Sequence, residues 1–148
     1  GLVAAFLDLV AWLGAKNARP ENDLLVSVLV IVKDRDDVVE RFLRRLCSLG
    51  ISGTTLRYEV IAIDDYSTDQ TWAIVRRLCS SLTMLKAIRM ADVSDPREGA
   101  GGIGLFMCAG KIALVCRLMR ETDDLALLDS FRGMLQRPRR GQPLTLMG

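Results

Sequence analysis

The chain has 148 residues, 50% of them hydrophobic and 26% charged, values typical of a single globular domain with a buried core. A formal net charge of +2 is small for this length, so composition gives no case for a nucleic-acid partner. The absence of histidine excludes Ser-His-Asp and Cys-His nucleophile schemes and any His-ligated zinc site. The four cysteines form no Cys-x-x-Cys pair, and we expect reduced thiols in a cytosolic protein.

The first segment of the chain is strongly apolar, and residues 2–16 predict a helix with one broad apolar face. It is too short to cross a bilayer, which needs about 20 residues. The chain begins at Gly1 rather than Met, so we expect a processed or cut sequence. The segment is either a helix docked on the domain or the trailing end of a membrane helix removed upstream. We expect an apolar helix at 1–18, an α/β domain at 24–136 and a tail at 137–148.

Strands and helices are predicted to alternate after this segment. Continuous apolar, β-branched runs predict strands at 24–32, 58–63, 85–90 and 111–118. Helical spacing predicts helices at 38–49, 69–82, 102–110 and 123–135, the last entered through Thr122 or Asp123 as cap. This order predicts an α/β fold with a mostly parallel open sheet and helices on both faces.

Charged and hydroxyl side chains follow the predicted strands. Right-handed crossovers bring the carboxyl ends of parallel strands to one edge of the sheet, where ligands of open α/β sheets bind. The side chains gathered there are Lys33, Asp34, Arg35, Asp64, Asp65, Ser67, Asp69, Asp92, Asp95 and Arg117.

Two segments resemble a known family. VSVLVIVKDRDDVVERFLRRL reads as an apolar strand, a polar loop and a helix. YEVIAIDDYSTDQTWAIVRRL ends its strand in Asp-Asp-x-Ser-x-Asp-x-Thr, which begins at Asp64. In this order and spacing they resemble the first half of a family 2 glycosyltransferase, with the Rossmann-like GT-A fold.

The resemblance implies a nucleotide sugar of the UDP type as ligand. It places the base or ribose on Asp64 and Asp65, and it places the backbone near Val32 and Lys33 along the base pocket. Asp34 and Arg35 stand where the family's opening loop often carries an Asn-Glu pair, and we expect Asp34 among the nucleotide-binding residues.

The departures from the family fall on its chemistry. After GKIALV the family has an apolar residue and then Asp-x-Asp, whereas this chain has Cys116, Arg117, Leu118 and Met119. Arg117 cannot ligate a divalent cation, so we expect none, and it could instead clamp a diphosphate. If a displaced metal site exists, its carboxylates are Glu121, Asp123 and Asp124. No catalytic residue is assigned.

Three hypotheses stay open. The first is the nucleotide-binding half of a glycosyltransferase, and the second is a catalytically degenerate interaction or scaffold domain. The second places a membrane or homodimer contact on the apolar side of residues 2–13. In that case we expect the protein in the cytoplasm, at the cytoplasmic face of a membrane. The third is an α/β domain with no ligand, in which Asp64 and Asp65 serve only the turn and the helix entry.

Overall fold

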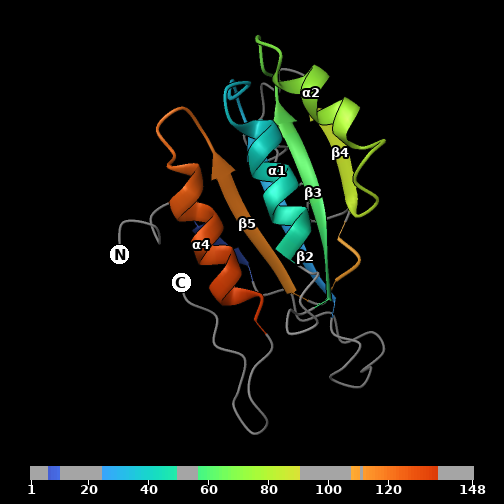
Figure 1. Cartoon of the computed structure of the whole chain (residues 1–148), viewed down its shortest axis with the longest axis vertical. Helices are drawn as coiled ribbons and strands as arrows, with labels where there is room; N and C mark the ends of the chain where they lie inside the picture. The colour runs from blue at the N-terminus through green and yellow to red at the C-terminus, as the bar shows by residue number, and fades with distance from the viewer. Residues whose placement is uncertain (1–6, 11–24, 50–56, 91–107, 111, 137–148) are drawn as a thin grey trace, which may run out of the picture.

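A computed structural model of the chain describes residues 7–10, 25–49, 57–90, 108–110 and 112–136. In this part of the chain, five strands form one sheet in the order β1-β5-β2-β3-β4 (Figure 1). The strands are β1 (Leu7–Val10), β2 (Leu25–Val32), β3 (Arg57–Asp65), β4 (Leu85–Met90) and β5 (Ile112–Leu118). The helices are α1 (Val39–Ser48), α2 (Thr71–Leu78) and α4 (Asp124–Met134).

Four of the strands run parallel, as the sequence predicts. β2 lies at the centre between β3 and β5, and β4 pairs with the outer side of β3. Val32 is level with Asp64 on one side and with Leu118 on the other, so the three strands end at the same edge. The four predicted strands and the predicted helices at 38–49, 69–82 and 123–135 are confirmed to within a few residues at their ends, because continuous apolar runs and helical spacing are strong local signals.

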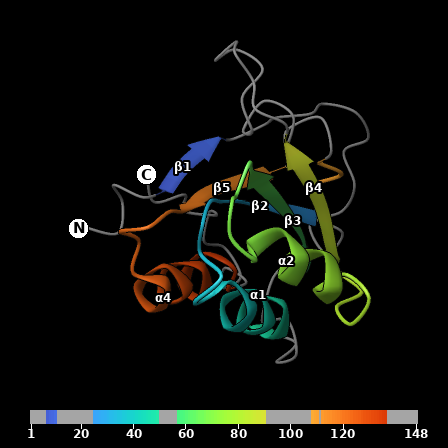
Figure 2. The ribbon, with the colours of Figure 1, turned by 90° about the horizontal axis from the view of Figure 1, so that it is seen from above.

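The described helices all cover one face of the sheet (Figure 2). The prediction of helices on both faces is not met by these residues. The short helix expected at 102–110 falls mainly outside the described residues, and residues 108–110 are not helical.

Two apolar clusters occupy the two faces of the sheet. The cluster on the helix side joins alternate strand residues, among them Val30 and Ala62, to Phe42 of α1 and Phe131 of α4. The opposite face carries a smaller buried cluster, composed of Leu29, Ile31, Ile61, Ile63, Met90, Ala113 and Val115. Because side chains alternate along a strand, membership of a cluster assigns each strand residue to a face.

The predicted N-terminal helix is wrong where the structure describes that segment. Leu7–Val10 form β1, which pairs antiparallel with β5, so that Leu7 lies level with Cys116. Backbone pairing with an existing strand outweighs helical spacing in so short a segment. The membrane or homodimer contact expected on residues 2–13 stays a prediction. Among the described helices, none is long and apolar enough to cross a bilayer.

Candidate functional site at the carboxyl edge of the sheet

The carboxyl ends of β2 and β5 form the point where the chain direction in the sheet reverses. From β2 the chain moves outward to β3 and β4, and it then returns to β5 on the other side of β2. Ligands of open α/β sheets bind outside the strand ends at such a point. The backbone N–H of Lys33 donates to the carbonyl of Leu118 at 3.3 Å, which closes the ladder between the two strands at this edge.

The loops after β2 and β3 are bonded to one another. Each uses side-chain oxygens to accept backbone N–H groups of the other. From the first loop the donors are the N–H groups of Asp34 to Ser67 Oγ (3.0 Å), Arg35 to Thr71 Oγ1 (2.9 Å) and Asp36 to Asp69 Oδ2 (3.2 Å). In return, the N–H groups of Thr68 and Gln70 donate to Asp34 Oδ1 (2.7 Å) and Asp36 Oδ2 (3.3 Å).

This interlock assigns a structural role to most of the second motif. Its serine, third aspartate and final threonine hold the first loop instead of facing a ligand. Asp34, a predicted nucleotide-binding residue, accepts the N–H of Thr68 with one carboxylate oxygen and adopts a positive φ of 50°. Aspartate tolerates this left-handed conformation better than most residues. The pattern had no signature in the sequence, because the partners lie about 34 residues apart.

Asp64 lies on the helix side of the sheet and is fully buried. Its Oδ2 accepts the N–H of Ser67 at 3.2 Å and lies 3.7 Å from Nε of Arg89 on β4. Its Oδ1 has no hydrogen-bond partner. Arg89, which the sequence analysis did not single out, also donates to the carbonyl of Ser67 at 3.4 Å. Asp64 therefore holds the turn that follows β3.

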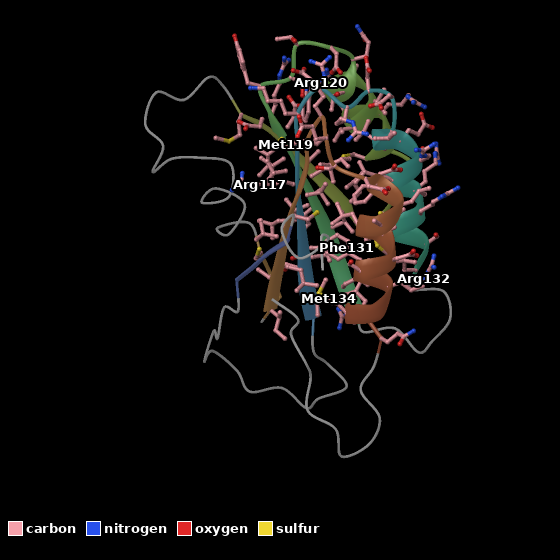
Figure 3. All side chains as sticks on the ribbon, turned by 90° about the vertical axis from the view of Figure 1, so that its left-hand side faces the viewer. Arg117, Met119, Arg120, Phe131, Arg132 and Met134 are labelled. Carbon is pink, nitrogen blue, oxygen red and sulfur yellow. The ribbon has the colours of Figure 1, made fainter. Side chains whose placement is uncertain are left out.

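Asp65 lies on the opposite face from Asp64, because it follows Ile61 and Ile63 in the strand alternation. Arg117 follows Ala113 and Val115 in the same way and is exposed on that face. Figure 3 shows Arg117 on the side of the sheet away from α4, whereas Phe131 lies between α4 and the sheet. The predicted pair of an acid and a guanidinium is thus brought to one rim and one face, with β2 between them.

The turn between β5 and α4 is held by Arg35, whose side chain is buried. Its Nη1 donates to the carbonyls of Met119 at 2.5 Å and Thr122 at 2.9 Å. The hydroxyl of Thr122 donates to the carbonyl of Arg117 and accepts the N–H of Met119, both at 3.0 Å. Asp37 pairs with the outer edge of the guanidinium at 3.0 Å. The sequence placed Arg35 at this edge but gave no sign that it would bind another turn.

The side chains at the end of β5 do not fit a divalent metal. Mg²⁺ and Mn²⁺ take carboxylate, carbonyl and water oxygens, whereas the two positions matching the family's Asp-x-Asp are Arg117 and Met119. Two of the three displaced carboxylates are committed elsewhere: Asp123 Oδ1 accepts the N–H groups of Leu125 and Ala126, and Asp124 pairs with Arg41 at 2.9 Å. The third, Glu121, is exposed. Within the described residues no group of three or more acidic or sulfur ligands could hold a metal ion.

The comparison with known families decides the identity of the fold. The family model described as "Glycosyl transferase family 2" matches residues 27–102, which include both loops of the interlock. The chain belongs to glycosyl transferase family 2. The resemblance in the two quoted segments is thereby confirmed, and so is the assignment to the GT-A class of α/β fold.

Curated relatives and solved structures agree with this assignment. The chain is 37% identical over 76 residues to a beta-monoglucosyldiacylglycerol synthase of Synechocystis sp., covering 51% of this chain and 15% of that protein. A protein of the same name from Nostoc sp. is 34% identical over 91 residues, covering 61% of this chain and 19% of the relative. The chain therefore spans under a fifth of these relatives.

Among solved structures, S. aureus TarS in complex with UDP-GlcNAc matches with a TM-score of 0.51 at 26% identity, over 64% of this chain and 26% of that one. The mannosyltransferase PcManGT from Pyrobaculum calidifontis, in complex with GDP-Man and Mn2+, matches with a TM-score of 0.54 at 20% identity. That match covers 68% of this chain and 30% of the other, and it supports the fold alone. Both neighbours hold nucleotide sugars.

Proposed function

We propose that this chain forms the nucleotide-binding part of a glycosyltransferase and that Asp65 receives the nucleoside of a nucleotide sugar. The observation that carries the proposal is the placement of Asp65 on the face and at the edge that also hold Arg117, beside the end of β2. A carboxylate at this place can accept hydrogen bonds from a base imide or from ribose hydroxyls. The UDP-GlcNAc bound to the TarS neighbour supports the same class of ligand.

The interlocked loops supply the rigidity that such a site needs. Asp65 ends β3. The turn after it is bonded to Asp64 and Arg89, and Ser67 in this turn also accepts the N–H of Asp34 from the loop after β2. The backbone that carries Asp65 is thus fixed before a ligand binds, which lowers the ordering cost of binding and favours affinity. In this assignment Asp64 positions the turn, Asp65 contacts the nucleoside, and the backbone near Val32 and Lys33 borders the base.

Thermal unfolding with UDP and GDP tests the proposal. A ligand that binds only the native state at one hundred times its Kd stabilises it by about 2.7 kcal/mol, which raises Tm by roughly 5–10 °C for a domain of this size. Asp65→Asn should remove most of that shift, because the amide replaces an acceptor oxygen by a donor. Asp129→Asn, an exposed change on α4, is the control and should keep it. Equal shifts in both variants, or none in the native chain, would contradict the proposal.

Binding without sugar transfer is a second candidate, and the side chains of Arg117 and Met119 favour it. These residues stand where the family's carboxylates would be, so the chain can retain a nucleoside site without the chemistry. Incubation with UDP-glucose, followed by chromatography of UDP and free sugar, separates the two candidates. Release of UDP above the buffer rate would favour the enzyme, and binding with no release would favour the second candidate.

A further inference from the structure

The end of β5 carries positive charge at the position that matches the first carboxylate of the family's Asp-x-Asp. Arg117 is exposed on the face that also presents Asp65, and its Cα is level with that of Ile31 in β2. Lys33 is exposed directly after β2 and continues the ladder to Leu118, so strand alternation puts it on the face of Ile31 and Arg117. Two cationic side chains therefore flank the point where the chain direction reverses.

The backbone beneath these charges is fixed in a way that keeps carboxylates out. Arg35 binds the carbonyls of Met119 and Thr122, and Thr122 binds the backbone of Arg117 and Met119. These bonds leave the turn no freedom to bring Asp123 or Asp124 to the strand end without breaking a buried guanidinium contact, which is costly. The cationic character of this edge is thus built into the fold.

We propose that Arg117, with Lys33, holds the diphosphate of a nucleotide sugar in place of a divalent cation. This inference rests on the proposed function. A guanidinium can bind two phosphate oxygens at once through its N–H groups, and the two side chains together match the +2 charge of the metal they replace. Asp65 and Arg117 lie on strands separated by two strand spacings, about 10 Å. A nucleoside diphosphate bridges such a separation with its base at one end and its phosphates at the other.

Calorimetric titration of the full chain with UDP and with uridine tests the inference, each in EDTA and again in Mn²⁺. We expect UDP to bind with the same affinity in both conditions. Arg117→Met keeps an unbranched, largely aliphatic side chain, although a shorter one, and removes the charge. The variant should weaken the affinity for UDP about tenfold or more and leave the affinity for uridine unchanged, because charge-assisted hydrogen bonds to phosphate are lost. Arg132→Met is the matched control on α4, far from the edge (Figure 3), and should change neither ligand.

Arg117→Lys separates lost charge from lost folding. It should retain part of the UDP affinity, since it keeps a cation without the bidentate geometry. Three results would overturn the inference while leaving the nucleoside site intact. UDP binding could require Mn²⁺, Arg117→Met could bind UDP with unchanged affinity, or the variant could lose affinity for UDP and uridine equally. Failure of the native chain to bind both UDP and uridine would overturn the proposed function itself, and this inference with it.

Discussion

At the scale of single residues, two adjacent aspartates have opposite tasks because successive strand side chains point to opposite faces. Asp64 is buried on the helix side and holds the turn after β3. Asp65 is half-buried on the other face, toward Arg117. The turn-only interpretation therefore describes Asp64, and the ligand-binding interpretation is left to Asp65 as a prediction.

Arg35 is the residue on which the geometry of the β5–α4 turn depends. Arg35→Met should lower the free energy of unfolding by about 2–4 kcal/mol, because the carbonyls of Met119 and Thr122 lose a charged donor in a buried place. Urea denaturation followed by circular dichroism measures this loss. Arg132→Met, which removes an exposed pair with Asp129, should cost under about 0.5 kcal/mol. A similar cost for the two variants would show that the buried contacts contribute little.

At the scale of elements, the start of α4 shows a sequence prediction resolved by the structure. Thr122 and Asp123 were both candidate caps, and Asp123 accepts the N–H groups of Leu125 and Ala126 at 3.1 and 3.3 Å. The hydroxyl of Thr122 is used within the preceding turn. Thr122 therefore stabilises the turn after β5, and Asp123 caps the start of α4. Asp124 then ties α4 to Arg41 of α1.

Replacing the cap tests this division. Asp123→Ala should lower the free energy of unfolding by about 1 kcal/mol, the usual loss when a capping carboxylate is removed. Chemical denaturation of the variant beside the native chain gives the value. Asp123→Asn should restore most of the stability, because asparagine caps as well as aspartate. If Asp123→Asn is as unstable as Asp123→Ala, the carboxylate has a role beyond the cap.

At the scale of the whole molecule, the two edges of the sheet differ in their polar contacts. At the amino edge, Glu59 accepts the hydroxyl of Ser27 at 2.7 Å, the N–H of Ala109 at 2.8 Å and Lys86 Nζ at 3.2 Å. The N–H of Gly110 donates to Ser27 Oγ at 2.9 Å. This buried network fastens the entry of β5 to β2 and β3. Its polar groups are bonded to one another, whereas Asp65 and Arg117 at the carboxyl edge are partly or fully exposed.

The network also predicts how stability depends on pH. Burial raises the pKa of Glu59, but the hydrogen bonds from Ser27, Ala109 and Lys86 outweigh it, and the pKa lies below its ordinary value of 4.5. A depressed pKa stabilises the native state above the ordinary value and stops doing so as pH falls through the folded-state value. The pKa of Asp69 is lowered too, so its contribution has the same sign. Stability should therefore fall on acidification below about pH 4.5.

Glu59→Gln isolates the part that belongs to this network. The variant should be about 1 kcal/mol less stable than the native chain at pH 7, and the difference should shrink toward pH 3, because only the native carboxylate is lost to protonation. Urea denaturation at a series of pH values gives both curves. Asp129→Asn, at an exposed position, should run parallel to the native curve. A Glu59→Gln curve parallel to the native one would remove Glu59 from the acid transition.

The sequence by itself determined the alternating strands and helices, the parallel sheet, the family and the edge that holds the candidate site. These follow from apolar runs, helical spacing and one compact motif, which are local signals. Tertiary structure alone decided that Leu7–Val10 join the sheet, that Asp64 and Asp65 part to opposite faces, and that Arg35 fixes the turn after β5. The reason is physical: pairing, alternation and buried hydrogen bonds depend on partners distant in the chain, and no local pattern names those partners.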